Sequence, residues 1–173
     1  MDGTLSERRP NRLRDWDYSR AGYYFITVCT KDKTLLLWDA DSSVGADSIR
    51  PRAGLSRYGQ IVDTAIHNIP EYYSNVWVDK QVVMPNHIHL ILAVGGDDGR
   101  MLSAPTKSIS TIVGQMKRSA SKAAGISLWQ KSFHDHIIRS EADYLRIWGY
   151  IDHNPAKWRE DCYFEEGPRA AGS

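Results

Sequence analysis

The segment 84–92, with the sequence MPNHIHLIL, carries two histidines separated by one residue. In a β-strand, residues two apart point to the same side and lie roughly 6.5 to 7 Å apart. His87 and His89 therefore share a face, and their ring nitrogens can converge on one metal ion at ~2.1 Å each. The pattern predicts a metal site. Two half-buried histidines that only make hydrogen bonds are the other interpretation.

Other parts of the sequence indicate which metal ion such a site would bind. Neither Cys29 nor Cys162 has the spacing of a metal ligand, and the HExxH pattern is absent, so the zinc protease and zinc ribbon classes are disfavoured. Two nitrogens completed by a side-chain oxygen and waters leave open positions for a phosphate. This arrangement suits Mg²⁺ or Mn²⁺ in phosphodiester chemistry, where the metal polarises the phosphoryl oxygen.

A candidate nucleophile and a third ligand lie near the end of the chain. The segment Glu141–His153 has helical periodicity and is followed by Asn154 and Pro155. Tyr150 and Asn154 are four residues apart, so a helix that persists to its end brings a phenolic oxygen and an amide oxygen to one place. His153 is a rival ligand. A core aromatic at Tyr150, followed by a simple helix stop, is the other interpretation.

A tyrosine is a weak nucleophile at neutral pH because its pKa is about 10. Tyr150 therefore needs a nearby cation to attack a phosphate, and a divalent metal on His87 and His89 would supply one. The predicted product is a covalent phosphotyrosine enzyme.

The remaining patterns predict the elements that must position these groups. Runs of β-branched and aromatic residues indicate strands, and apolar residues at three- and four-residue intervals indicate amphipathic helices. Pro85 and Asn86 separate two apolar runs and predict a tight hairpin turn. The predicted elements are, in order, a strand at 23–30, a helix at 55–69, two strands at 75–84 and 87–94, a helix at 108–123, a strand at 132–138 and the helix Glu141–His153.

This order is that of the α+β class with a ferredoxin-like split βαβ fold, in which a mainly antiparallel sheet carries its helices largely on one face. With 173 residues, 42% of them hydrophobic, the chain is long enough for one domain over 1–173. No apolar run approaches the ~20 residues that span a bilayer, and the first residues do not resemble a signal peptide. We therefore expect a soluble, cytoplasmic protein without membrane contacts.

Three segments are expected to lie outside this framework. Residues 1–20 form a basic and aromatic arm, in which Arg12 and Arg14 are candidates for DNA contact. Residues 39–54 are rich in Asp, Ser, Gly and Ala and predict a surface insertion. Residues 160–173 are expected to form a flexible tail.

The formal net charge is only +1, but basic residues concentrate in the segment 100–139. A locally basic stretch can hold phosphates even when the whole molecule is near neutral. Within it, Lys117, Arg118 and Lys122 lie on one predicted helix and are the stronger candidates for DNA contact. A solvated helix face is the alternative explanation of the same charges.

Several segments resemble the insertion-sequence tyrosine transposases, and most closely their REP-associated branch. The likeness rests on MPNHIHLIL (84–92), WQKSFHDHIIRSEADY (129–144) and YIDHNPAKW (150–158), and extends to DYSRAGYYFITVCT (17–30) and LSRYGQIV (55–62). It covers roughly residues 8–160. The class carries a His-hydrophobe-His metal motif, matched by His87 and His89, and a single helix tyrosine, matched by Tyr150. A polar residue four positions later, here Asn154, completes the metal site in relatives.

The resemblance implies a ferredoxin-like enzyme that binds hairpin-forming single-stranded DNA, then nicks and rejoins it through a 5′-phosphotyrosine link, using Mg²⁺ or Mn²⁺. Relatives act either as monomers or as homodimers. Two alternatives remain open from the sequence: a nucleic-acid-binding module that has lost catalysis, and a metal-dependent hydrolase that activates water instead of Tyr150.

Overall fold

The computed structural model describes residues 21–39, 54–95 and 107–164 of the chain. Within these ranges, strands and helices alternate in the predicted order. The elements are β1 (Gly22–Cys29), the 3-10 turn η1 (Lys31–Lys33), α1 (Arg57–His67), α2 (Ile69–Tyr72), β2 (Val76–Val83), β3 (His87–Val94), α3 (Ile109–Ala124), β4 (His134–Ile138), α4 (Glu141–His153) and the 3-10 turn η2 (Trp158–Glu160).

The four strands form one antiparallel sheet in the order β2-β3-β1-β4. The two central strands, β1 and β3, are not consecutive in sequence: β3 pairs on its outer side with β2, its hairpin partner, and β1 pairs on its outer side with β4. This is the ferredoxin-like arrangement expected from the sequence, and the prediction of fold class is confirmed. Because β3 is central, all eight of its residues are buried.

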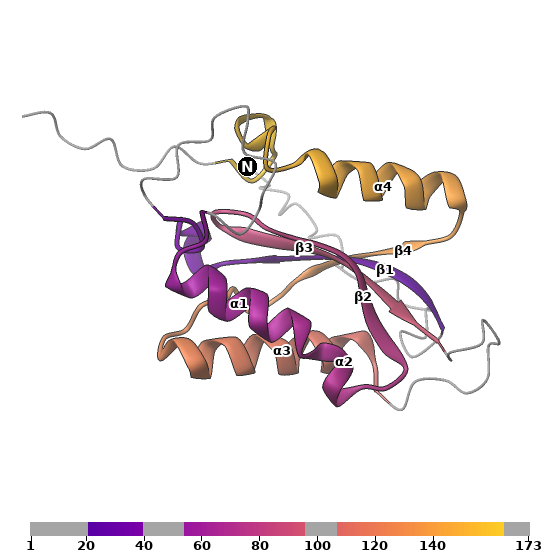
Figure 1. Cartoon of the computed structure of the whole chain (residues 1–173), viewed down its shortest axis with the longest axis horizontal. Helices are drawn as coiled ribbons and strands as arrows, with labels where there is room; N and C mark the ends of the chain where they lie inside the picture. Colours follow the sequence, from indigo (N-terminus) through magenta and orange to yellow (C-terminus); the bar gives the residue numbers. More distant parts are fainter. Residues whose placement is uncertain (1–20, 40–53, 96–106, 165–173) are drawn as a thin grey trace, which may run out of the picture.

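Helices cover both faces of the sheet, and the two faces differ in chemistry (Figure 1). Helices α1, α2 and α3 lie on one face, where alternate residues of the central strands, such as Ile26, Leu90 and Leu92, form the larger apolar core. Helix α4 lies alone on the other face and packs Ile147 and Ile151 against a smaller cluster. The face under α4 is the one that carries the two histidines.

Local signals explain where the helices begin and end. The side chains of Ser56, Ser108 and Ser140 each accept a hydrogen bond from a first-turn backbone N–H of α1, α3 and α4 respectively. Helix α3 stops at Gly125, whose φ of 72° is a left-handed conformation that glycine adopts readily. The predicted bounds of α4 agree with the structure, and those of the hairpin strands agree to within one residue.

Two expectations need correction. The helix predicted at 55–69 begins at Arg57 and ends at His67. Pro70 lies in the first turn of a second, short helix, α2, where a missing N–H is tolerated. Residues 160–164, expected in a flexible tail, belong to a packed segment in which Tyr163 and Phe164 contact the cluster under α4. The remainder of that tail, the arm 1–20 and most of the insertion lie outside the described residues.

The ends of the insertion lie side by side. The backbone N–H of Asp39 donates to Gly54 O over 2.9 Å, and Trp38 forms a bridge with Leu55. Within the described ranges, no helix is both long and apolar enough to cross a membrane.

Replacement of glycine by alanine should have opposite effects on stability at two helical positions, Gly59 and Gly149. A Cβ at Gly59 would lie 2.1 Å from the Leu37 carbonyl oxygen, whereas one at Gly149 meets nothing within 4 Å. We expect Gly59→Ala to destabilise the fold by more than ~1 kcal/mol, since backbone must move. Gly149→Ala should stabilise it by up to ~1 kcal/mol through the higher helix propensity of alanine. Urea denaturation of both variants measures the difference, and equal effects would contradict the packing described at Gly59.

Candidate metal and tyrosine site

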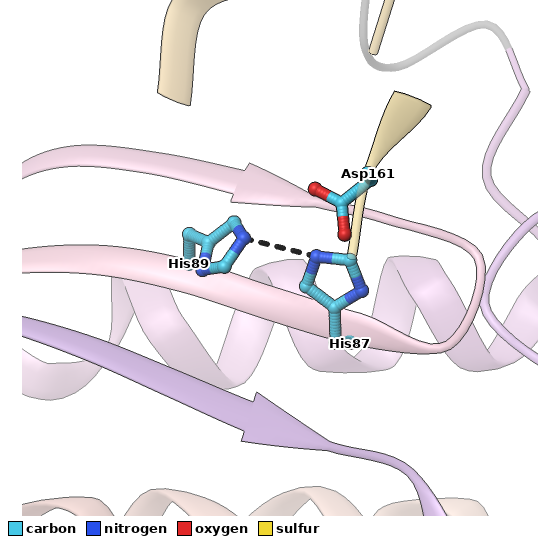
Figure 2. A group of neighbouring side chains, drawn as sticks. All are labelled: His87, His89 and Asp161. Carbon is cyan, nitrogen blue, oxygen red and sulfur yellow. Dashed lines mark hydrogen bonds between the residues drawn. The ribbon is translucent and has the colours of Figure 1, made fainter. Parts of the chain in front are cut away.

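The two histidines predicted as metal ligands lie side by side under α4. His87 is fully buried and His89 is 1% exposed, and their Nε2 atoms are 3.0 Å apart (Figure 2). Both project from β3 on the side away from the larger core, as the alternation along the strand requires. The two rings contact each other edge to face, with centroids 4.5 Å apart.

The second nitrogen of each imidazole is held by a neighbouring polar group. His87 Nδ1 is 2.9 Å from Asn86 Oδ1, and the Asn86 amide nitrogen in turn donates to Tyr163 O. His89 Nδ1 is 2.8 Å from Thr27 Oγ1 on the adjacent strand β1. Because Asn86 Oδ1 accepts, His87 Nδ1 carries the proton and its Nε2 presents a lone pair. Partners of this kind orient metal-binding histidines in known sites.

Both histidines are neutral at physiological pH. Burial lowers the pKa of His87 from 6.5 to about 4, against a smaller opposing effect of the Asp161 carboxylate. Burial also lowers the pKa of His89 well below its ordinary value, and proximity to His87 lowers it further. A neutral imidazole is the form that binds a metal.

A carboxylate joins the pair. Asp161 offers an oxygen that lies, with one nitrogen from each histidine, in a group whose ligand atoms are all within 4.8 Å of one another. Figure 2 shows this carboxylate above the two rings, brought there from beyond the end of α4. Sequence reasoning missed Asp161 because it placed the segment in a tail. No periodic pattern surrounds this residue, and the clustering of Trp158, Tyr163 and Phe164 nearby was the one usable sign of a packed segment.

The residues present fit a divalent metal. Two ligand atoms at ~2.1 Å from one ion, in adjacent positions of an octahedron, are about 3.0 Å apart, whereas tetrahedral positions are about 3.4 Å apart. The two Nε2 atoms lie 3.0 Å apart, close enough for both to reach one ion. Two imidazole nitrogens and a carboxylate oxygen would leave the remaining positions of an octahedral ion open to water or to a phosphate oxygen.

Tyr150 reaches the same place from α4. Its hydroxyl donates to Asp161 Oδ2 over 2.9 Å and lies 3.3 Å from His89 Nε2. Its ring packs edge to face against Phe25 of β1 and against His89. Burial raises the pKa of Tyr150 above its ordinary value of 10.0, and the hydrogen bond to Asp161 and the charge of that carboxylate raise it further. The phenolate therefore needs a cation beside it.

The two rival ligands after Tyr150 have different environments. Asn154 retains helical backbone angles, so it shares a helix face with Tyr150 as expected, and it is 3% exposed. Its amide nitrogen is buried without a hydrogen-bond partner. Because that nitrogen is a donor, a metal would have to be bound by Oδ1 of this side chain. His153 is exposed, and its Nδ1 pairs with Gly149 O over 2.7 Å. Among the described residues, His153 is not part of the group formed by the histidine pair and Asp161.

A cleft of about 320 Å³ opens beside the tyrosine. Solvent can reach the site from this side, while the histidines themselves stay behind the cleft wall. The cleft is lined by Gly149, Tyr150, His153, Asn154, Lys157, Glu160 and Asp161.

The basic residues singled out from the sequence do not gather around this site. The Lys117 ammonium donates to the carbonyls of Gln130, Lys131 and Ser132. Its contact with DNA stays a prediction. Arg118 and Lys122 are exposed, but α3 lies on the face of the sheet opposite α4 (Figure 1). Arg12 and Arg14 lie outside the described residues.

Comparisons with known proteins agree with the resemblance drawn from the motifs. No protein-family model matches the chain. An uncharacterized protein of Haemophilus influenzae is 33% identical over 175 residues, covering 91% of this chain and 93% of that protein. A candidate REP-associated tyrosine transposase of the same organism is 23% identical over 148 residues, covering 82% and 74%.

A solved structure shares the fold. It is that of a REP-associated tyrosine transposase bound to a REP hairpin, with a TM-score of 0.59, 23% identity, and coverage of 89% of this chain and 74% of that one. The chain belongs to one family with the uncharacterized Haemophilus influenzae protein, and it resembles the REP-associated tyrosine transposases in sequence and fold.

The buried histidines predict a pH dependence of stability. The folded chain holds His87 neutral down to a pH of about 4, whereas the unfolded chain binds a proton near pH 6.5. Between these values the unfolded state carries more protons than the folded state, so the free energy of unfolding should rise with pH. The contribution of His87 to it should be complete above pH 6.5. Urea denaturation from pH 4 to 7 measures this slope. His87→Gln should reduce the slope, and an unchanged slope in that variant would contradict a buried neutral His87.

Proposed function

We propose that this relative of the REP-associated tyrosine transposases is a metal-dependent enzyme that nicks and rejoins hairpin-forming single-stranded DNA. The proposal rests on one observation above all: the Tyr150 hydroxyl lies 3.3 Å from His89 Nε2 and 2.9 Å from Asp161 Oδ2. A tyrosine oxygen, a pair of neutral imidazoles and a carboxylate therefore meet at a cleft wall. This combination suits attack on a phosphodiester.

The proposed metal is Mg²⁺ or Mn²⁺. His87 and His89 would hold it, with Asp161 or Asn154 supplying an oxygen. When bound, such an ion stabilises charge on a phosphoryl oxygen and on a nearby phenolate. Asp161 contributes the negative charge that a site of two neutral imidazoles lacks, while Asn154 Oδ1 would be an uncharged ligand.

The chain's own residues account for the covalent step. Tyr150 Oη attacks the phosphorus, a bond forms between them, and the bond from phosphorus to the 3′-oxygen breaks. The phenolic proton has an acceptor already in place at Asp161 Oδ2, and the departing 3′-oxygen takes up a proton to become a hydroxyl. The enzyme then carries a 5′-phosphotyrosine link, and attack by a 3′-hydroxyl reverses the sequence and rejoins the strand.

The proposed partner is DNA. The structurally similar transposase is bound to a REP hairpin, and we propose a hairpin ligand for this chain as well. Lys157 lines the cleft and is exposed, so it is placed to meet a backbone phosphate. Arg118, Lys122, Arg12 and Arg14 remain proposed contacts to parts of the DNA farther from the tyrosine.

One copy of the chain supplies every group of the proposed site. We therefore propose that a monomer suffices for nicking, with a homodimer as the alternative assembly. The cytoplasm, where bacterial DNA lies, is the proposed location.

Covalent capture tests the reaction. Purified protein with Mn²⁺ and a single-stranded hairpin oligonucleotide should give a protein–DNA adduct that survives denaturing electrophoresis. Tyr150→Phe should abolish the adduct, because the ring is kept and only the attacking oxygen is lost. It should bind the same DNA with wild-type affinity, measured by fluorescence anisotropy.

The outcomes separate the competing functions. Strand scission that persists in Tyr150→Phe would favour a hydrolase that activates water. Salt-sensitive DNA binding without scission by the wild type at saturating Mn²⁺ would favour a binding module. Either result would contradict the proposal.

Metal affinity tests the ligand set independently of activity. Isothermal titration with Mn²⁺ should show that His87→Ala and His89→Ala each weaken Mn²⁺ binding by at least about tenfold. In known metal sites, the mutation of residues that only orient the ligands already lowers metal affinity by about tenfold or more. His153→Ala should bind Mn²⁺ as the wild type does. A comparison of Asp161→Ala with Asn154→Ala identifies the oxygen ligand, and Asp161→Ala should be the weaker binder. Unchanged affinity in both histidine variants would refute the proposed centre.

A further inference from the structure

The edge strand β2 contains an irregularity directly opposite the tyrosine helix. Val78 pairs with Leu92 of β3 and Lys80 pairs with Ile91, so Asp79 is an extra residue in the ladder. Such a bulge shifts the following residues to the opposite face of the sheet. Lys80 consequently shares a face with Ile91 and lies under α4, where a regular strand would have directed it toward the larger core.

Both residues of the bulge contact α4. The Tyr144 hydroxyl donates to Asp79 Oδ2 over 2.6 Å. Lys80 Nζ donates to Asp152 Oδ1 over 2.5 Å and also lies 3.6 Å from the centre of the Trp148 ring. The Tyr144 ring is further fixed by an edge-to-face contact with Tyr23 of β1, with centroids 5.4 Å apart.

These contacts bracket the nucleophile along the helix axis. At 1.5 Å per residue, Tyr144 lies about 9 Å before Tyr150, and Asp152 lies about 3 Å after it. The apolar packing of α4 is sparse, because Ile147 and Ile151 are its only buried residues. Two aliphatic side chains resist separation of the helix from the sheet, but they oppose sliding and rotation weakly. Directional hydrogen bonds on both sides of Tyr150 oppose both.

We propose that Asp79 and Lys80 are positioning residues that lock the register of α4 on the sheet, and so hold the Tyr150 hydroxyl beside His89. The inference rests on the proposed function in that Tyr150 is the nucleophile. Neither bulge residue needs to touch DNA or metal. Small displacements of a reacting group, of about 1 Å, can reduce a rate by about 100-fold, so the lock acts on the covalent step.

If the contacts of Asp79 and Lys80 with α4 served only stability, a different result would be expected. Exposed ion pairs add little to stability, so the loss of such a pair would leave the covalent step unchanged. Arg146 provides the matched case: it pairs with Asp143 over 2.6 Å within α4. Its removal leaves the separate bond of 2.7 Å from Asp143 to His136 of β4 in place. Arg146→Ala therefore controls for the removal of a surface charge from the same helix.

The experiment compares Asp79→Ala, Asp79→Asn, Tyr144→Phe and Arg146→Ala. The measured quantity is the single-turnover rate of covalent adduct formation at saturating Mn²⁺ and hairpin DNA. Asp79→Ala and Tyr144→Phe should each slow it by about tenfold or more. Asp79→Asn, which keeps an oxygen acceptor for the Tyr144 hydroxyl, should recover most of the rate, and Arg146→Ala should match the wild type. Mn²⁺ affinity should fall less than the rate in Asp79→Ala and Tyr144→Phe, because the two histidine ligands lie on the sheet and only the oxygen ligand follows α4.

Wild-type rates in Asp79→Ala and Tyr144→Phe would overturn the proposal, as would a loss of Mn²⁺ affinity in parallel with rate. Amide hydrogen exchange over residues 141–153 gives a second readout that does not depend on catalysis. Exchange should accelerate in Asp79→Ala and Tyr144→Phe but not in Arg146→Ala. If the wild type formed no adduct, the proposed function would fail, while the exchange measurement would still decide whether the bulge fixes α4.

Discussion

Strand β3 lies at the centre of the sheet and is covered on both sides, by α1 and α3 on one face and by α4 on the other. Its alternation assigns Ile88, Leu90 and Leu92 to the first face and His87, His89 and Ile91 to the second. Polar side chains are tolerated at such depth only when their hydrogen-bonding groups are satisfied. Asn86 and Thr27 meet that requirement for the Nδ1 atoms of His87 and His89 respectively.

The same burial determines the chemistry. It keeps both imidazoles neutral, and it raises the pKa of the Tyr150 phenol, so that the site without a cation disfavours the reactive phenolate. A divalent ion among these groups would reverse that balance. The cleft opens on the tyrosine side, which would let a phosphate approach Tyr150 while the histidines remain shielded from water. The sheet gives the two histidines rigid support, whereas Tyr150, the proposed nucleophile, lies on α4, in which Ile147 and Ile151 are the buried residues.

Sequence patterns were sufficient for the fold, because alternation along β3 and periodicity in α4 are strong, local signals. The pairing of His87 with His89 and the shared helix face of Tyr150 and Asn154 follow from the same periodicities. Asp161 was not predictable in this way: it lies 72 residues beyond His89 in a turn without periodicity, and only tertiary packing returns it to the sheet. The bonds of Lys117 to nearby carbonyls were not predictable either, because a basic residue at the border of a helix face can equally bind phosphates or donate to carbonyls.

The central claim is that the two Nε2 atoms, 3.0 Å apart, share one metal ion beside Tyr150. The most direct measurement is a crystal structure of the wild type with Mn²⁺ and a hairpin oligonucleotide, with anomalous data collected near the manganese absorption edge. The account predicts one strong anomalous peak at ~2.1 to 2.3 Å from both Nε2 atoms, with the Tyr150 hydroxyl facing a phosphate. An absent peak, or a peak bound by other residues while the histidine pair keeps its direct contact, would contradict it.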